Sequence, residues 1–454
     1  MLSVIKDFCI YAMGSALLRG MSALMAPLIL RVIDPQQYGT LALISSIIAL
    51  LTPLAGLGLR QVISIEYFHL DTRSRAQLVY IIIGVYLWCV TPIFILLYLL
   101  LHQPYWPIGN QLLLSLGLAI AFLHFFVELF YQLLRYEQRS MMLVLIQMMS
   151  ALMTACFTLS CLYILHLGIA GILLAQLIAL VIGTGFGIAY YIYTTRSMRI
   201  VYPRMTLSTI KYYVWYGLPF IPNTLFAWVL ASGDRWMLAR YATLHDVGIY
   251  ALADMACQLF QLLILNAWAG AYLPYMLTRY AHQKAQILII ERTNLIYMVV
   301  CMIGCGLCIL FGYGVCTPIM LWLLPVAYHG ALPQIWILLL GQVFLLGSYF
   351  ASTFIQFYKK RWFLSVGLCI PALINLILNY YLIPLFGLSG CTYATLAAYC
   401  IYFVITLCYN LFLQKQVSER IVYEGHDVAY TAATPAINHG VAHARHKPQE
   451  VAKL

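Results

Sequence analysis

Six charged side chains interrupt long apolar stretches of this sequence, and their types could carry chemistry. They are three arginines and three carboxylates: Arg19, Arg60, Arg235, Glu128, Asp234 and Asp254. A charge at the middle of a lipid bilayer costs about 2.5–3.5 kcal/mol on insertion scales, so such residues persist mainly where they face a cavity or a partner. We therefore take all six as candidate site residues.

The three arginines are candidates for binding a phosphate group in a cavity. A guanidinium keeps its charge and can grip a phosphate with two parallel hydrogen bonds. Arg19 is the strongest candidate because it lies about halfway along its apolar run, whereas Arg60 and Arg235 lie near the ends of theirs and could reach an interface. The alternative for Arg19 is a structural ion pair with Glu128 or Asp254.

The three carboxylates, Glu128, Asp254 and Asp234, are candidates for binding a coupling proton or Na⁺. Burial disfavours the charged form of a carboxylate, which makes protonation possible near neutral pH. The alternative is that these carboxylates serve as partners of the arginines. The sequence does not decide between the two interpretations.

The composition places these residues in a membrane protein. Hydrophobic residues make up 64% of the chain and charged residues only 9%, against about 25% charged residues in soluble domains. A chain of 454 residues with so few charges cannot cover its surface in water, so its outer surface must face the lipid bilayer. The formal charge of +11 sits mainly in short loops, which favours membrane orientation over nucleic-acid binding.

Apolar runs of spanning length predict an all-α polytopic fold with about twelve transmembrane helices. The runs are 8–31, 40–64, 78–101, 112–134, 141–165, 169–194, 212–238, 247–277, 293–325, 333–358, 362–384 and 388–413. Pro318 interrupts the ninth run, which could therefore be two shorter helices. We predict an N-terminal six-helix lobe (1–195), a cytoplasmic linker (196–211), a C-terminal six-helix lobe (212–414) and a disordered cytoplasmic tail (415–454).

The positive charges alternate between the two sides of this arrangement. Odd-numbered connections hold only Arg31 and Arg240, whereas the even-numbered ones hold Arg73, Arg75, Arg135, Arg139, Arg196, Arg199, Arg204, Lys211, Arg279, Lys284, Arg292, Lys359, Lys360 and Arg361. Because cytoplasmic loops carry the excess of Lys and Arg, both termini are predicted to be cytoplasmic.

The two halves of the chain resemble each other in order. Gly39 opens "GTLAL" and Gly248 opens "GIYAL", and "LGIAGILLA" at 167–175 parallels "FGLSGCTYA" at 386–394. With six helices per half, both halves enter the membrane from the same side, so the repeat is parallel. The prediction is two six-helix lobes around a central cavity, which rock to expose it to either side.

Three segments resemble the Wzx-type polysaccharide flippases of the multidrug/oligosaccharidyl-lipid/polysaccharide exporter superfamily. They are "LILRVIDPQQYGTLAL" at 28–43, "YGLPFIPNTLFAWVLASGDRWMLARYATLHDVGIYALADM" at 216–255 and "NLILNYYLIPLFGLSGCTYAT" at 375–395. The resemblance runs through nearly all of 1–414. Asp234 and Arg235 match the family's Asp-Arg pair, and Gly39 and Gly248 match its glycines after the loops.

The resemblance implies a function in the bacterial inner membrane. Family members carry an undecaprenyl-diphosphate-linked oligosaccharide from the cytoplasmic to the periplasmic leaflet for O-antigen, capsule or exopolysaccharide synthesis. By family analogy, a polysaccharide polymerase and a chain-length regulator are possible partners. Glu66 and Asp254 depart from the family pattern, which often has a basic residue at the first position and an aromatic or small residue at the second.

Two other classes of protein stay open at this stage. The first is another transporter of the same superfamily, exporting drugs or lipid II. The second is a membrane polysaccharide polymerase, although its acid–base chemistry usually needs a sizeable outer loop with carboxylates, and the outer loops here are short. The sequence predicts no enzyme activity, metal, cofactor or nucleic-acid partner.

Overall fold

The computed structural model describes residues 20–21, 24–67, 70–101, 111–195, 206–218, 221–265, 268–283 and 286–433. Within these ranges all regular structure is helical, which confirms the all-α prediction. The chain divides into two compact units, Met1–Leu407 and Cys408–Leu454. Every element described below lies in the first unit, except the end of the last helix.

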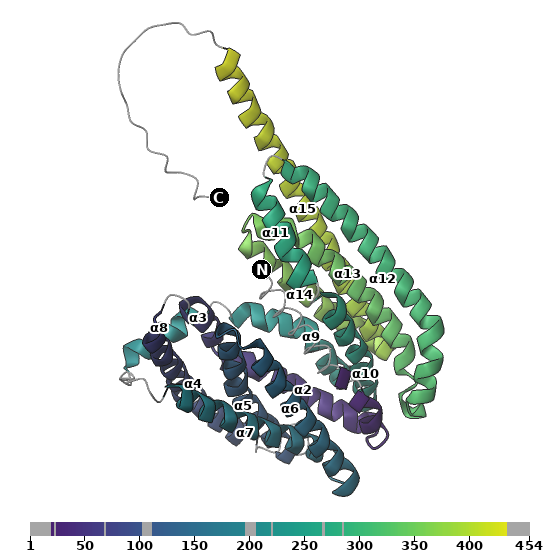
Figure 1. Cartoon of the computed structure of the whole chain (residues 1–454). Coiled ribbons are helices and arrows are strands. Elements are labelled where there is room, and N and C mark those ends of the chain that lie inside the picture. Colours follow the sequence, from purple (N-terminus) through teal and green to yellow (C-terminus); the bar gives the residue numbers. More distant parts are fainter. Residues whose placement is uncertain are drawn as a thin grey trace. The chain divides into compact units, whose positions relative to one another are not determined.

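The N-terminal half packs around α5 (Gln111–Tyr136), which contacts each of α2, α4, α6 and α7 (Figure 1). The bounds of the other elements of this half are α2 (Pro35–Ala55), α3 (Leu59–Glu66), α4 (Thr72–Leu101), α6 (Ser140–Leu159), the π-helical η2 (Ser160–Ile164) and α7 (Gly168–Thr195). Tyr86 on α4 stacks on Phe125 of α5 with ring centroids 3.8 Å apart, inside a core of apolar side chains.

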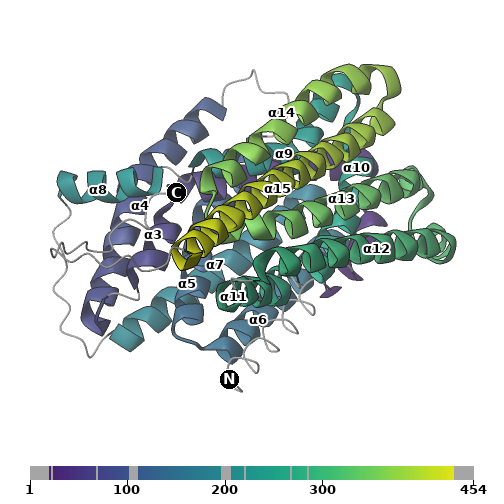
Figure 2. The same cartoon turned by 90° about the horizontal axis from the view of Figure 1, so that it is seen from above.

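The C-terminal half packs around α13 (Ala331–Phe357), which contacts α10, α11, α12 and α14. The other elements are α8 (Leu207–Gly217), α9 (Ile221–Tyr241), α10 (Leu244–Phe260), the π-helical η4 (Gln261–Leu265) and η5 (Trp268–Tyr272), α11 (Leu273–His282), α12 (Ile287–Leu323), the 3₁₀-helical η7 (Val326–Tyr328), α14 (Arg361–Phe386) and α15 (Leu388–Ala433). Figures 1 and 2 both show α12 running alongside α13.

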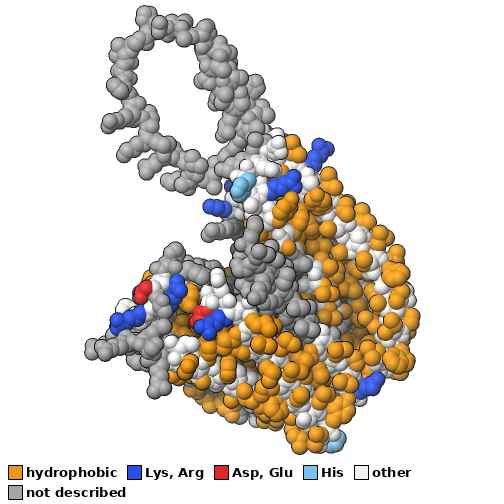
Figure 3. Space-filling model, viewed as in Figure 1, with side chains coloured by type: hydrophobic (Ala, Val, Ile, Leu, Met, Phe, Trp, Pro, Cys, Tyr) orange, Lys and Arg blue, Asp and Glu red, His pale blue; other side chains and the backbone are white. Residues whose placement is uncertain are grey.

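Ten helical segments in the described part of the chain are long and apolar enough to cross a membrane. They correspond one by one to ten of the twelve predicted spans. The first predicted span begins outside the described residues, and the seventh corresponds to α8 and α9, the second of which carries Asp234 and Arg235. Figure 3 shows hydrophobic side chains over most of the described surface on its visible face, as a surface in contact with lipid requires.

Several predicted spans differ in detail from the observed helices. The second is broken after α2 by a turn that contains Gly58 at φ +67°, and α3 follows. The eighth comprises α10, η4, η5 and α11 rather than one α-helix. The ninth, α12, continues through Pro318, so the alternative of two shorter helices is wrong; neighbouring groups in a membrane helix can satisfy the carbonyl that a proline leaves free. Finally, α15 stays helical to Ala433, beyond residue 415, where we expected the disordered tail to begin.

The internal repeat is visible in the backbone. Gly168 and Gly387, at matching positions of the similar segments 167–175 and 386–394, have φ values of +55° and +57°. Gly168 is the first residue of α7 and Gly387 directly precedes α15, so each lies at the start of the last helix of its half. A positive φ is unfavourable for residues with a side chain, which explains glycine at both places.

One of the contacts between the two halves is the crossing of α2 and α10. Each helix begins with a side-chain cap: Asp34 accepts a hydrogen bond from the backbone N–H of Gln37, and Thr243 forms a capping box with Asp246. Five residues after each cap lies a glycine of the repeat, Gly39 or Gly248. A Cβ on Gly39 would lie 2.0 Å from the Leu244 carbonyl oxygen, and one on Gly248 would lie 1.9 Å from the Pro35 carbonyl oxygen. Only glycines allow the helices to approach this closely.

Candidate functional site

An ion pair joins two helices in the N-terminal half. Arg60 on α3 donates from Nη1 to Oε2 of Glu128 on α5 at 3.0 Å. The side chains keep 34% and 32% of their surface exposed, so each remains open to a further partner. One turn along α5, Gln132 donates from Nε2 to the backbone carbonyl of Arg60 at 2.9 Å, which fixes α3 against α5.

This pair lines a pocket of about 440 Å³ between α2, α5 and α7. We call it the N-half pocket, and it is lined by Ser45, Ile48, Ala49, Thr52, Pro53, Arg60, His124, Glu128 and Gln176. His124 precedes Glu128 by one helical turn. Its Nδ1 atom and the Thr52 Oγ1 atom are buried without a hydrogen-bond partner in the part of the chain that the structure describes. The pocket therefore combines a cation, an anion and unused polar atoms.

A second ion pair lies in the C-terminal half. Arg235 on α9 donates from Nη2 to Oδ2 of Asp254 on α10 at 2.5 Å. These side chains are only 11% and 21% exposed. Gln258 adds a hydrogen bond from Nε2 to the same oxygen of Asp254 at 3.1 Å. The pair thus ties α9 to α10 and leaves little surface for a ligand.

The neighbouring residue, Asp234, is buried without an arginine partner. Neutral groups surround its carboxylate: Tyr250 donates its hydroxyl to Oδ2 at 2.5 Å, Thr395 donates to Oδ2 at 2.8 Å, and Asn379 donates from Nδ2 to Oδ1 at 2.6 Å. Asn379 also donates to Oδ1 of Asn375, one turn earlier on α14, at 3.1 Å. We call these five residues the Asp234 cradle, which joins α9, α10, α14 and α15.

The structure shows which of the candidate arginines and carboxylates form ion pairs, a question that the sequence left open. Glu128 pairs with Arg60 and Asp254 pairs with Arg235, so two of the carboxylates are partners of arginines. Arg19 lies outside the described residues. The charges fall into two separate groups, one on α3 and α5 and the other on α9 and α10.

Sequence reasoning missed the neutral members of both groups. His124, Tyr250, Asn379 and Thr395 were not singled out, because neutral polar side chains in apolar runs carry no distinct signal. One signal was available: Asn375 and Asn379 stand four residues apart in "NLILNYY", a spacing that places both on one face of a helix.

A further buried carboxylate, Glu291 on α12, was also missed. It accepts a hydrogen bond from the Tyr280 hydroxyl and bonds from Asn294 Nδ2 to both of its oxygens, at 3.3 Å and 3.1 Å. Asn294 also donates to the Phe350 carbonyl at 3.1 Å, and Tyr272 donates to Asn294 Oδ1 at 2.9 Å. This network ties α11, α12 and α13 together.

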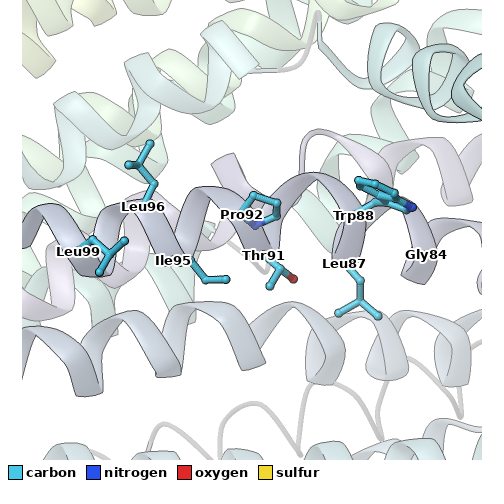
Figure 4. Close-up of a pocket in the computed structure, with 8 residues that line it drawn as sticks. All are labelled: Gly84, Leu87, Trp88, Thr91, Pro92, Ile95, Leu96 and Leu99. Atoms are coloured by element: carbon cyan, nitrogen blue, oxygen red, sulfur yellow. The ribbon is translucent and has the colours of Figure 1, made fainter.

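A pocket of about 770 Å³ on α4 has a different chemistry (Figure 4). All of its lining residues come from that one helix: Gly84, Leu87, Trp88, Thr91, Pro92, Ile95, Leu96 and Leu99. Trp88, Leu96 and Leu99 are well exposed, as side chains that face lipid would be. Because no charged side chain lines this groove, we do not take it as a headgroup site. Among the described residues, no three of His, Cys, Asp and Glu gather as metal ligands either.

The fold is that of a class of multi-pass membrane transporters. It resembles a lipid II flippase, MurJ, in its inward closed conformation (TM-score 0.68, 14% identity, covering 94% of each chain). It also resembles an inward-facing MATE multidrug resistance transporter of the MOP superfamily (TM-score 0.65, 14% identity, 88% of this chain and 96% of that one). A third similar structure is a MOP superfamily transporter from Pyrococcus furiosus (TM-score 0.55, 13% identity, 92% of this chain and 96% of that one).

The family itself is given by sequence. Residues 4–280 match the family described as "Polysaccharide biosynthesis protein", and the chain belongs to that family. No curated protein matches the sequence. The chain is therefore a multi-pass membrane protein of a polysaccharide biosynthesis family with the fold of MOP-superfamily transporters.

Proposed function

We propose that this protein is a flippase, which carries undecaprenyl-diphosphate-linked oligosaccharide repeat units from the cytoplasmic to the periplasmic leaflet. The repeat units would serve the synthesis of a surface polysaccharide. The observation that carries the proposal is the N-half pocket, a polar site that contains an arginine and lies among apolar helices. The family of the chain, polysaccharide biosynthesis, supports the same function. A large hydrophilic headgroup needs such a site to cross the bilayer core, while its polyprenyl tail stays in lipid.

Alternating access supplies the mechanism. The two halves touch through α2, which crosses α10 at Gly39 and Gly248 and also contacts α9, and through α8, which packs on α3 and α4. Trp228 and Trp236 of α9 both donate to Ser46 of α2, to its carbonyl at 2.8 Å and to its hydroxyl at 2.9 Å. In the proposed cycle, the lobes separate at these contacts on one side of the membrane while they come together on the other side. The headgroup site therefore opens to one side at a time.

The Asp234 cradle is the proposed site of ion coupling. A buried carboxylate with neutral partners is stabilised by taking up a cation, either a proton or Na⁺. Asn375 Nδ2 and Asn379 Oδ1 are buried without partners in the described chain. Since the two atoms of an amide can exchange places by rotation, Asn379 could turn an oxygen toward a cation beside Asp234. Asp254 and Glu128 are less suited because each already has an arginine.

The rest of the proposal concerns placement and partners. The protein would lie in the bacterial inner membrane with both termini in the cytoplasm, as the bias of Lys and Arg between loops favours. Its bound substrate would be handed to a polysaccharide polymerase working with a chain-length regulator. Arg19, Arg60 and Arg235 remain the proposed cavity cations, with Arg235 acting mainly as the partner of Asp254.

Deletion of the gene in its host tests the proposal. We expect surface polysaccharide to be lost and the lipid-linked repeat unit to accumulate in the cytoplasmic leaflet, with both effects reversed by a plasmid-borne copy. Units that reach the outer leaflet but stay unjoined would indicate a polymerase instead. Unchanged polysaccharide with altered drug sensitivity would indicate a drug exporter.

A further inference from the structure

We propose that the N-half pocket is a subsite for one sugar residue of the headgroup, which it recognises through the hydroxyl groups of the sugar. The inference rests on the proposed flippase function and names the part of the substrate that this pocket contacts. It also changes the role of Arg60, from gripping the diphosphate to binding the sugar together with Glu128.

The unused polar atoms of the pocket point to a ligand. Thr52 Oγ1 and His124 Nδ1 are both buried and lack a partner in the described chain. Native structures rarely leave buried polar atoms unpaired, and such exceptions commonly mark a missing water or ligand. The two atoms come from different helices, α2 and α5, and both residues line the same pocket. A single ligand between these helices could satisfy both.

The charge balance of the pocket selects the class of ligand. Arg60 and Glu128 lie 3.0 Å apart, so the pocket offers a cation and an anion side by side with no net charge. A phosphate would be attracted by Arg60 but repelled by Glu128. A sugar hydroxyl both donates and accepts, so adjacent hydroxyls can bond to Glu128 and to Arg60 at once.

The remaining lining residues fit the same ligand. Ser45 and Gln176 add groups that donate and accept hydrogen bonds, while Ile48, Ala49 and Pro53 provide an apolar wall for the C–H face of a sugar ring. The volume of about 440 Å³ lies within the range of small-molecule sites. A drug without polar groups would leave the ion pair and the unpaired atoms unsatisfied, which disfavours that class of ligand.

A binding comparison with two probes tests the inference. The probes are the lipid-linked repeat unit extracted from the deletion host and undecaprenyl diphosphate, which has no sugar. The key variant is Thr52→Val, which removes a hydroxyl that has no partner within the described chain and so breaks no hydrogen bond seen there. We expect about tenfold weaker binding of the repeat unit, the effect of one lost hydrogen bond to a ligand, and a change below about twofold for undecaprenyl diphosphate.

Thr184→Val is the matched control. Thr184 on α7 also carries a buried hydroxyl without a partner in the described chain, but it lines a separate pocket. The control should bind both probes as the unmodified protein does. A second pair of variants guards against a folding defect: His124→Gln should weaken binding of the repeat unit, whereas His124→Asn, which keeps a polar atom near the Nδ1 position, should restore most of it.

The outcomes separate this inference from the proposed function. If Thr52→Val and His124→Gln bind both probes like the unmodified protein, the pocket holds water only and the inference is overturned, while the flippase proposal stands. If the unmodified protein binds the two probes equally, no sugar subsite exists. If it binds neither probe, the flippase proposal fails and this inference fails with it.

Discussion

The two halves of the molecule each hold an arginine–carboxylate pair, but in different surroundings. In the N-terminal half, Arg60 and Glu128 keep about a third of their surface exposed and line a pocket. In the C-terminal half, Arg235 and Asp254 are 11% and 21% exposed, and beside them Asp234 is fully enclosed by neutral donors.

The difference indicates a division of labour between chemically similar groups. A partly exposed pair can exchange its partner for a ligand at little cost, because its charges are already partly solvated. A buried pair cannot, because separating it leaves an uncompensated charge inside the protein. We therefore assign substrate recognition to the N-terminal pair, and we assign ion coupling to Asp234, with the Arg235–Asp254 pair holding α9 in place.

The variant Asp234→Asn tests most strongly whether ion coupling depends on Asp234. We expect transport to fall to the level of an empty vector, because the amide cannot take up and release a cation. The protein should still fold, since the asparagine Oδ1 can accept from the Tyr250 and Thr395 hydroxyls. Surface polysaccharide and the protein yield from purified membranes would measure the two effects. Near-normal polysaccharide from this variant would exclude Asp234 as the coupling group.

Replacement of each arginine by glutamine compares the two pairs directly. Arg235→Gln should lower the free energy of unfolding by about 3–5 kcal/mol, because Asp254 is left buried without its cation. Arg60→Gln should cost no more than about 1 kcal/mol, the scale of exposed pairs. Equilibrium unfolding in mixed detergents measures both.

The double variant Arg235→Gln/Asp254→Asn serves as the control for that comparison. It should regain much of the lost stability, because no buried charge is left alone. Equal costs for the two single arginine variants would show that the difference in exposure has no energetic meaning.

The contact between the halves can be tested at Gly248. Gly248→Ala should lower the free energy of unfolding by about 1–3 kcal/mol, because the new Cβ would meet the Pro35 carbonyl at 1.9 Å and push α2 from α10. Gly304→Ala on α12 is the control, since a Cβ there meets no atom within 4 Å. The control should be neutral or stabilising by about 0.5–1 kcal/mol. A similar result for both variants would contradict the close crossing.

Trp236→Phe should have the smallest effect. It removes the indole N–H that bonds to the Ser46 hydroxyl across the two halves, which we expect to cost about 1 kcal/mol. Trp336→Phe is matched to it, because the Trp336 Nε1 atom has no partner in the described chain. Thermal unfolding of the two purified variants should therefore differ, and identical curves would argue against the hydrogen bond.

Much of the fold could be predicted from apolar runs and charge bias. Ten predicted spans have counterparts that are long and apolar enough to cross a membrane, and the matched glycines Gly168 and Gly387 share a positive φ. The breaks within spans were harder to predict. The turn at Gly58 and the π-helical segments after Phe260 depend on packing between helices, which a single sequence does not reveal.

The site could be predicted only in part. Its charged residues stand out in apolar runs because burying a charge is costly, and five of the six lie in the described chain. Their partners could not be predicted, because Arg60 and Glu128 are 68 positions apart and only the folded helices bring them together. The neutral cradle of Asp234 was hidden for a similar reason: Tyr250, Asn379 and Thr395 come from three different helices.

Reconstitution of the purified protein into liposomes tests the central claim most directly. Lipid-linked repeat units would be placed in one leaflet, and their arrival in the other would be followed with and without a gradient of protons or Na⁺. We expect gradient-driven translocation by the unmodified protein and by Thr184→Val, and none by Asp234→Asn, although that variant should still bind the repeat unit. Equal translocation by the Asp234→Asn variant would contradict the assignment of recognition and coupling to different halves. Translocation by the unmodified protein that no gradient accelerates would contradict it as well.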